Sequence, residues 1–94
     1  MRIDGLTRSV GFTGLDERDY IVNYYLTSRG KAFGIAAEKV AADAGAGLLF
    51  NEWEDTGGIT YDKDEALRLL NRLADGIVTP TTLCEMVDEL TAEV

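Results

Sequence analysis

Apolar and polar side chains alternate along the first third of the chain, which predicts β-strands. Residues 19–27 are rich in strand-preferring residue types. With a period of two, the side chains on one face of this strand are Tyr20, Val22, Tyr24 and Leu26. A shorter strand is expected near residues 6–12, between turns that contain glycine. The alternative for residues 17–28 is a helix capped at Asp16, because acidic residues would fill its first turn.

After Lys31 the apolar positions recur three or four residues apart, which predicts a helix over residues 31–44. The apolar side chains on one face of this helix are Phe33, Ala36, Ala37, Val40 and Ala44. Gly45 and Gly47 would end it, because glycine accepts the positive φ that a helix C-terminus often requires.

Two strand-like runs follow, residues 47–54 and residues 59–61, and they flank Gly57 and Gly58. This arrangement predicts a β-hairpin. The glycine pair does not indicate a phosphate-binding loop, because such a loop requires a helix directly after it and usually a lysine.

Two further helices are expected in the last third of the chain. Asp62 and Glu65 have the spacing of a capping box, so the first helix begins there and ends at Gly76. Its buried side chains would be Ala66, Leu67, Leu69, Leu70 and Leu73. Thr79 and Pro80 have the residue types of a helix cap and a first helical position. The apolar face of this last helix consists of Leu83, Val87, Leu90 and Val94, with Met86 at its edge.

These elements predict an α+β protein with a small, mainly antiparallel sheet and three helices packed on one face of it. A length of 94 residues, 46% of them hydrophobic, is enough for one core and too short for two ordinary domains, so residues 1–94 are expected to form a single compact domain. If residues 17–28 are helical, the alternative is a mostly α protein with one β-hairpin.

Charge is distributed unevenly along the chain, whose total net charge is −8. Residues 1–40 carry five acidic and six basic side chains, a net of +1, whereas residues 41–94 carry twelve acidic and three basic ones, a net of −9. Binding to a phosphate backbone relies on clustered Lys and Arg. We therefore expect no direct contact with nucleic acid through the second half.

Residue types that often carry catalysis are scarce. The chain has no histidine, which excludes Ser–His and Cys–His nucleophilic systems. A single cysteine, Cys84, excludes an intramolecular disulfide and a cysteine-only zinc site. Cys84 adjoins Leu83, so we expect it to be a small core residue. The acids near the hairpin lack the spacing of a calcium loop. We expect neither an enzyme nor a cofactor or metal site.

No apolar run approaches the roughly 20 residues that a membrane-spanning helix needs. The N-terminus also lacks the basic start and apolar stretch of a secretory signal. Both observations predict a cytoplasmic protein with no membrane partner.

Two groups of residues are candidates for binding a protein partner. The first group lies in the predicted hairpin and consists of Glu52, Trp53, Glu54 and Asp55. The second lies on the predicted last helix and consists of Glu85, Asp88, Glu89 and Glu93. Tryptophan is enriched at binding hot spots, and grouped carboxylates attract basic surfaces over long range. The structural alternatives are that Trp53 covers the core and that the helical acids form a solvated face.

The function we expect is that of a small acidic, non-enzymatic binding protein that docks on a basic surface of a protein partner. One version is a nucleic-acid-mimicking inhibitor of the anti-CRISPR or anti-restriction kind, an analogy that rests on size and charge alone. The alternative is a structural or assembly subunit that forms a homodimer through its C-terminal helices. Salt separates the two, because screening weakens a contact between exposed charges and leaves an apolar interface intact.

Overall fold

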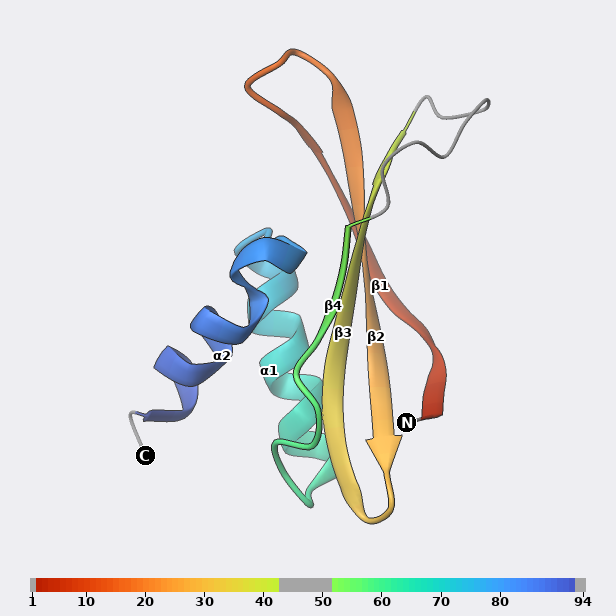
Figure 1. Ribbon diagram of the computed structural model, residues 1–94, viewed down its shortest axis with the longest axis vertical. Coiled ribbons are helices and arrows are strands. Elements are labelled where there is room, and N and C mark those ends of the chain that lie inside the picture. Colours follow the sequence, from red (N-terminus) through yellow and green to blue (C-terminus); the bar gives the residue numbers. More distant parts are fainter. Residues whose placement is uncertain (1, 43–51, 93–94) are drawn as a thin grey trace.

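The computed structural model describes residues 2–42 and residues 52–92. These residues form a four-stranded antiparallel sheet and two helices on the same side of it (Figure 1). The strands are neighbours in chain order: β1 (Arg2–Thr13), β2 (Asp19–Arg29), β3 (Ala32–Ala41) and β4 (Glu52–Asp55). The helices are α1 (Lys63–Asp75) and α2 (Leu83–Ala92), and the short 3₁₀ turn η1 (Pro80–Thr82) precedes α2. We call the side of the sheet that the helices cover the helix face, and the other side the open face.

β2 confirms the strand predicted for residues 19–27. Its alternate side chains Val22, Tyr24 and Leu26 are buried, and the strand pairs with β1 on one side and β3 on the other. The short strand expected near residues 6–12 is part of the longer β1. The helix considered for residues 17–28 is wrong, because these residues form a turn and the strand that follows it.

The helix predicted over residues 31–44 is wrong, because residues 32–41 form β3, which pairs with β2 from end to end. The prediction of three helices is therefore corrected to two among the described residues, within the α+β class. The mostly α alternative is also wrong. The pattern misled because four consecutive residues, Gly34–Ala37, are buried. A strand that is covered on both faces lacks the alternation by which strands are recognised.

The hairpin predicted around Gly57 and Gly58 is corrected as well. Residues 59–60 do not fold back on β4 but continue along β3, where the Ile59 N–H donates to the Phe33 carbonyl oxygen at 2.8 Å. β4 itself pairs with β3 through Glu52–Asp55. The two glycines therefore interrupt a single edge segment instead of joining two paired strands. The first part of the predicted hairpin, residues 47–51, lies outside the described residues, as do Gly45 and Gly47.

The helix predicted after Asp62 is confirmed as α1. The Asp62 side chain accepts a hydrogen bond from the Asp64 backbone N–H at 3.0 Å, and Gly76 caps the other end. In a capping box the Glu65 side chain would accept from the Asp62 backbone N–H. Here that N–H donates instead to the Thr60 hydroxyl at 3.1 Å. The side chain of Glu65 accepts from that hydroxyl at 3.4 Å. Thr60 therefore links the edge segment to the start of α1.

The hydrophobic core lies between the helix face and the two helices. Its largest fully buried side chains are Tyr24, Ile35, Leu70, Leu73, Leu83 and Val22. The Tyr24 hydroxyl crosses this core and donates to the Val78 carbonyl oxygen at 2.7 Å. On α2, Leu83 and Val87 are buried, and Met86 and Leu90 pack against the core at its margin. The apolar stripe of α2 is thus used within the chain. No helix in the described part is long and apolar enough to cross a membrane.

Candidate functional site

β4 and the start of α2 meet at one edge of the molecule. β4 packs against both η1 and α2, and the Cys84 Sγ lies 3.6 Å from the Asp55 carbonyl oxygen, to which it donates. Cys84 is exposed, so the prediction of a core residue is wrong. Leu83 occupies the core position, and a helix turns by 100° per residue, which places Cys84 at the flank next to β4.

The acids of the two predicted groups approach one another around this thiol. Partial burial raises the pKa of Cys84, and the negative charges of Glu54, Asp88 and Asp55 raise it further. Glu54 and Asp55 come from β4, whereas Asp88 lies one helical turn after Cys84 on the same flank of α2. Carboxylates from segments 34 positions apart in sequence, Glu54 and Asp88, therefore share one surface.

The remaining acids extend this surface in two directions. Glu85 and Glu89 are exposed on α2, one position beyond Cys84 and Asp88. Glu52 lies two residues before Glu54, so its side chain leaves β4 on the same face. We call the whole set the acidic edge: Glu52, Glu54, Asp55, Glu85, Asp88 and Glu89. Glu93, which was also predicted to bind, lies outside the described residues.

Trp53 belongs to the other face of the sheet. It pairs with Glu38 of β3 and packs on Tyr25, with ring centroids 5.7 Å apart and planes inclined by 44°. The indole is 41% exposed. Because neighbouring strand residues point to opposite faces, Trp53 and Asp55 are directed to the open face while Glu52 and Glu54 are directed to the helix face. Trp53 therefore neither covers the helix-face core nor lies among the acids of α2.

A row of polar side chains crosses the open face next to Trp53, and the sequence pattern did not reveal it. The Ser9 hydroxyl donates to Asn23 Oδ1 at 2.6 Å, and Asn23 Nδ2 donates to Glu38 Oε1 at 3.3 Å. The Tyr25 hydroxyl donates to the same Glu38 oxygen at 3.2 Å. Burial raises the pKa of Tyr25, and the Glu38 charge adds to the effect. The signal available in the sequence was one polar residue from each of three strands, namely Ser9, Asn23 and Glu38. These residues can be recognised as neighbours only once the strand register is known.

Two basic side chains of the sheet, Lys39 and Arg8, are used locally. Lys39 Nζ lies 4.4 Å from the Tyr20 ring centroid, a cation–π distance. Arg8 Nη1 contacts Asp75 Oδ1 of α1 at 2.8 Å. Within residues 2–42 and 52–92, no group of three Cys, Asp or Glu side chains is arranged to hold a metal ion. What the edge offers chemically is therefore a set of negative charges on a rigid strand and helix.

Comparison with known proteins adds a family but no activity. Neither a curated protein nor a solved structure shows significant similarity to the chain. The model of a family of unknown function, DUF6514, matches residues 6–93. The chain therefore belongs to this family of unknown function.

Proposed function

We propose that the protein is a small, non-enzymatic binding protein that docks the acidic edge on a basic surface of a protein partner in the cytoplasm. The observation that supports this most is the convergence of Glu54 and Asp55 of β4 with Asp88 of α2 around Cys84. Two groups of acids that are distant in sequence thus contribute to one local electrostatic field. Two separate patches of solvated acids would not reinforce each other in this way.

The physical role of such an edge is to attract and orient the partner. Exposed carboxylates contribute little affinity each, because water and salt screen them. Their summed field raises the association rate and disfavours acidic partners. Affinity then has to come from less polar contacts beside the acids.

Trp53 and Tyr25 are suited to supply those contacts. The two tilted rings lie on the open face immediately across β4 from Glu54, and the indole remains 41% exposed. A partner that reaches around the thin edge formed by β4 would meet carboxylates on one side and an aromatic anchor on the other. A nucleic-acid-binding protein has the required basic surface, so inhibition by nucleic-acid mimicry is one form of this proposal.

Self-association through the C-terminal helices is the weaker proposal. Leu83 and Val87, which would have to form the interface, are buried in the core of the same chain. A dimer that used them would have to open this core, at a cost of several buried side chains.

Affinity purification from the native cell at two ionic strengths tests the proposal. Co-purified proteins should be retained at about 0.1 M salt and lost at about 1 M, where screening acts over about 3 Å. The variant Glu54→Lys with Asp88→Lys should lose them. The control Asp64→Lys with Glu65→Lys changes the net charge equally on α1 and should retain them. Docking through the acidic edge would be refuted if the co-purified proteins were retained at both salt concentrations and also by the Glu54→Lys and Asp88→Lys variant.

A further inference from the structure

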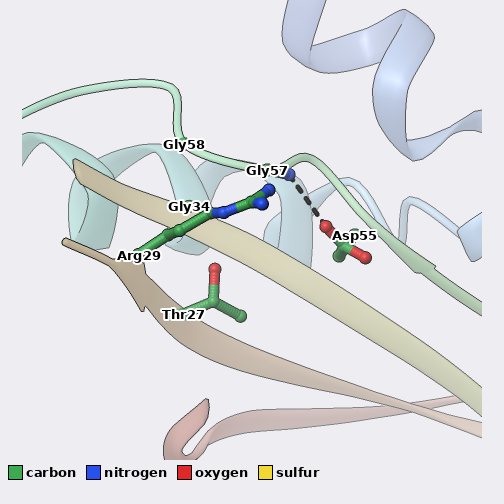
Figure 2. Close-up of a pocket in the computed structure, with 6 residues that line it drawn as sticks. All are labelled: Thr27, Arg29, Gly34, Asp55, Gly57 and Gly58. Carbon is green, nitrogen blue, oxygen red and sulfur yellow. Dashed lines mark hydrogen bonds between the residues drawn. The ribbon is translucent and has the colours of Figure 1, made fainter. Parts of the chain in front are cut away.

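A small pocket opens on the open face, at the end of the sheet where β2 turns into β3. It has a volume of about 140 Å³ and is lined by Thr27, Arg29, Gly34, Asp55, Gly57 and Gly58. Figure 2 shows Arg29 extending from β2 across β3 towards Gly57, with Asp55 on the far side. Arg29 and Gly58 are exposed, so the pocket is accessible from solvent.

Glycine at position 34 lets the two walls of the pocket approach each other. A Cβ on Gly34 would lie 1.9 Å from the carbonyl oxygen of Gly57, closer than atoms can come. The segment after β4 therefore passes directly over β3. Gly57 has a φ of +67°, a conformation that favours glycine. These backbone features fix the position of Asp55 relative to β2, because the Gly57 N–H donates to Asp55 Oδ1 at 2.9 Å.

Three polar side chains face the pocket with unused capacity. Thr27 is 2% exposed, its hydroxyl points towards the pocket in Figure 2, and it has no hydrogen-bond partner in the described part of the chain. Arg29 forms no ion pair within the described ranges. Asp55 uses Oδ1 for the Gly57 N–H and keeps its second carboxylate oxygen available. Hydrogen bonds to these three groups would contribute to the binding of a polar ligand.

Arg29 and Asp55 carry opposite charges on one pocket without pairing with each other. A ligand that contains both charges a short distance apart would complement both. A purely anionic ligand would meet the Asp55 carboxylate, and a purely cationic one would meet the guanidinium. The volume of about 140 Å³ is large enough for the few non-hydrogen atoms of such a ligand.

We propose that this pocket binds the zwitterionic head of a free α-amino acid. Arg29 and the Thr27 hydroxyl donate to the carboxylate, and the Asp55 carboxylate accepts from the ammonium group. A longer side chain extends through the solvent-accessible opening. The site shares Asp55 with the acidic edge, but its test requires no protein partner.

Titration of the ¹⁵N-labelled protein with glycine, followed by NMR, tests the assignment. The backbone amides of Gly34, Gly57 and Gly58 should shift saturably, with a Kd on the order of 1 mM, as suits so small a ligand. N-acetylglycine lacks the ammonium group and glycinamide lacks the carboxylate, so each should bind at least about tenfold more weakly.

Variants locate the site. Arg29→Gln should weaken glycine binding about tenfold, because a charge-assisted hydrogen bond is lost from an exposed side chain. Thr27→Val keeps the shape of the buried side chain and should also weaken binding. Arg68→Gln, on α1 on the other side of the sheet, should leave binding unchanged. The proposal is overturned if glycine causes no saturable shift, if N-acetylglycine binds as tightly as glycine, or if Arg29→Gln binds like the unaltered protein.

Discussion

At the scale of single residues, Gly34 is the position where two segments of the chain come closest. A Cβ there would lie 1.9 Å from the Gly57 carbonyl oxygen and 2.9 Å from the Thr27 hydroxyl oxygen. The shorter of these contacts is with a backbone atom, so a rotamer change cannot relieve it. The close crossing of the edge segment over β3 depends on this one residue.

Gly34→Ala should therefore destabilise the protein by about 2 kcal/mol or more. The matched control is Gly11→Ala in β1, where the nearest atom to the new Cβ is the Tyr20 carbonyl oxygen at 3.8 Å. This control should be neutral or slightly stabilising, because alanine restricts the unfolded chain. Urea unfolding measures both. Equal stability of the two variants would contradict the crossing of the segments.

Tyr24 supplies a second prediction at this scale. Burial raises its pKa to about 12, so the native state favours the neutral phenol. The stability from this preference is complete below the unfolded pKa of about 10 and is lost as the pH rises through 12. Tyr24→Phe removes the hydrogen bond to Val78 and should cost about 1 kcal/mol at neutral pH. The difference in free energy of unfolding between the unaltered protein and Tyr24→Phe should become smaller above pH 10. A difference that stays constant with pH would contradict the prediction.

At the scale of elements, the sequence pattern was informative where one face is buried and misleading where both are. β2 and α1 show the periods of two and 3.6 because each has one solvated side. Residues 34–37 of β3 are all buried: α1 packs on one side, the edge segment lies over Gly34 on the other, and the small side chains imitate the apolar face of a helix. The hairpin around Gly57 and Gly58 was mistaken because a turn and a bulge use the same residue types.

The cap of α1 gives the prediction that belongs to this scale. Asp62→Ala removes the acceptor for the Asp64 N–H and should cost about 1 kcal/mol. Asp64→Ala is the control, because its side chain makes no hydrogen bond in the described part of the chain. It should cost only a few tenths of a kcal/mol through the helix dipole. Thermal unfolding followed by circular dichroism compares them, and a larger loss for Asp64→Ala would mean that Asp62 is not the cap.

At the scale of the whole molecule, the fold converts a charge imbalance along the chain into a local surface. The acids of β4 and α2 were identifiable from the sequence, but their proximity was not, because it depends on how α2 returns to the sheet edge. The same return placed Cys84 outside the core, next to the Asp55 carbonyl oxygen at 3.6 Å. The orientation of Trp53 likewise depends on strand register. Local sequence patterns therefore could not predict which residues that are distant in sequence lie close together in the fold.

Cys84 provides a direct probe of that placement, since its thiol lies among the converging acids. The pH dependence of its alkylation by iodoacetamide at low ionic strength should give a pKa above the ordinary value of 9.0 for a thiol. Glu54→Gln should lower this pKa and speed alkylation about two- to threefold at pH 8, because a negative charge is removed nearby. Glu65→Gln, on α1, should have no effect. A thiol that titrates at or below its ordinary pKa, or one that responds equally to both substitutions, would contradict the convergence of the β4 and α2 acids.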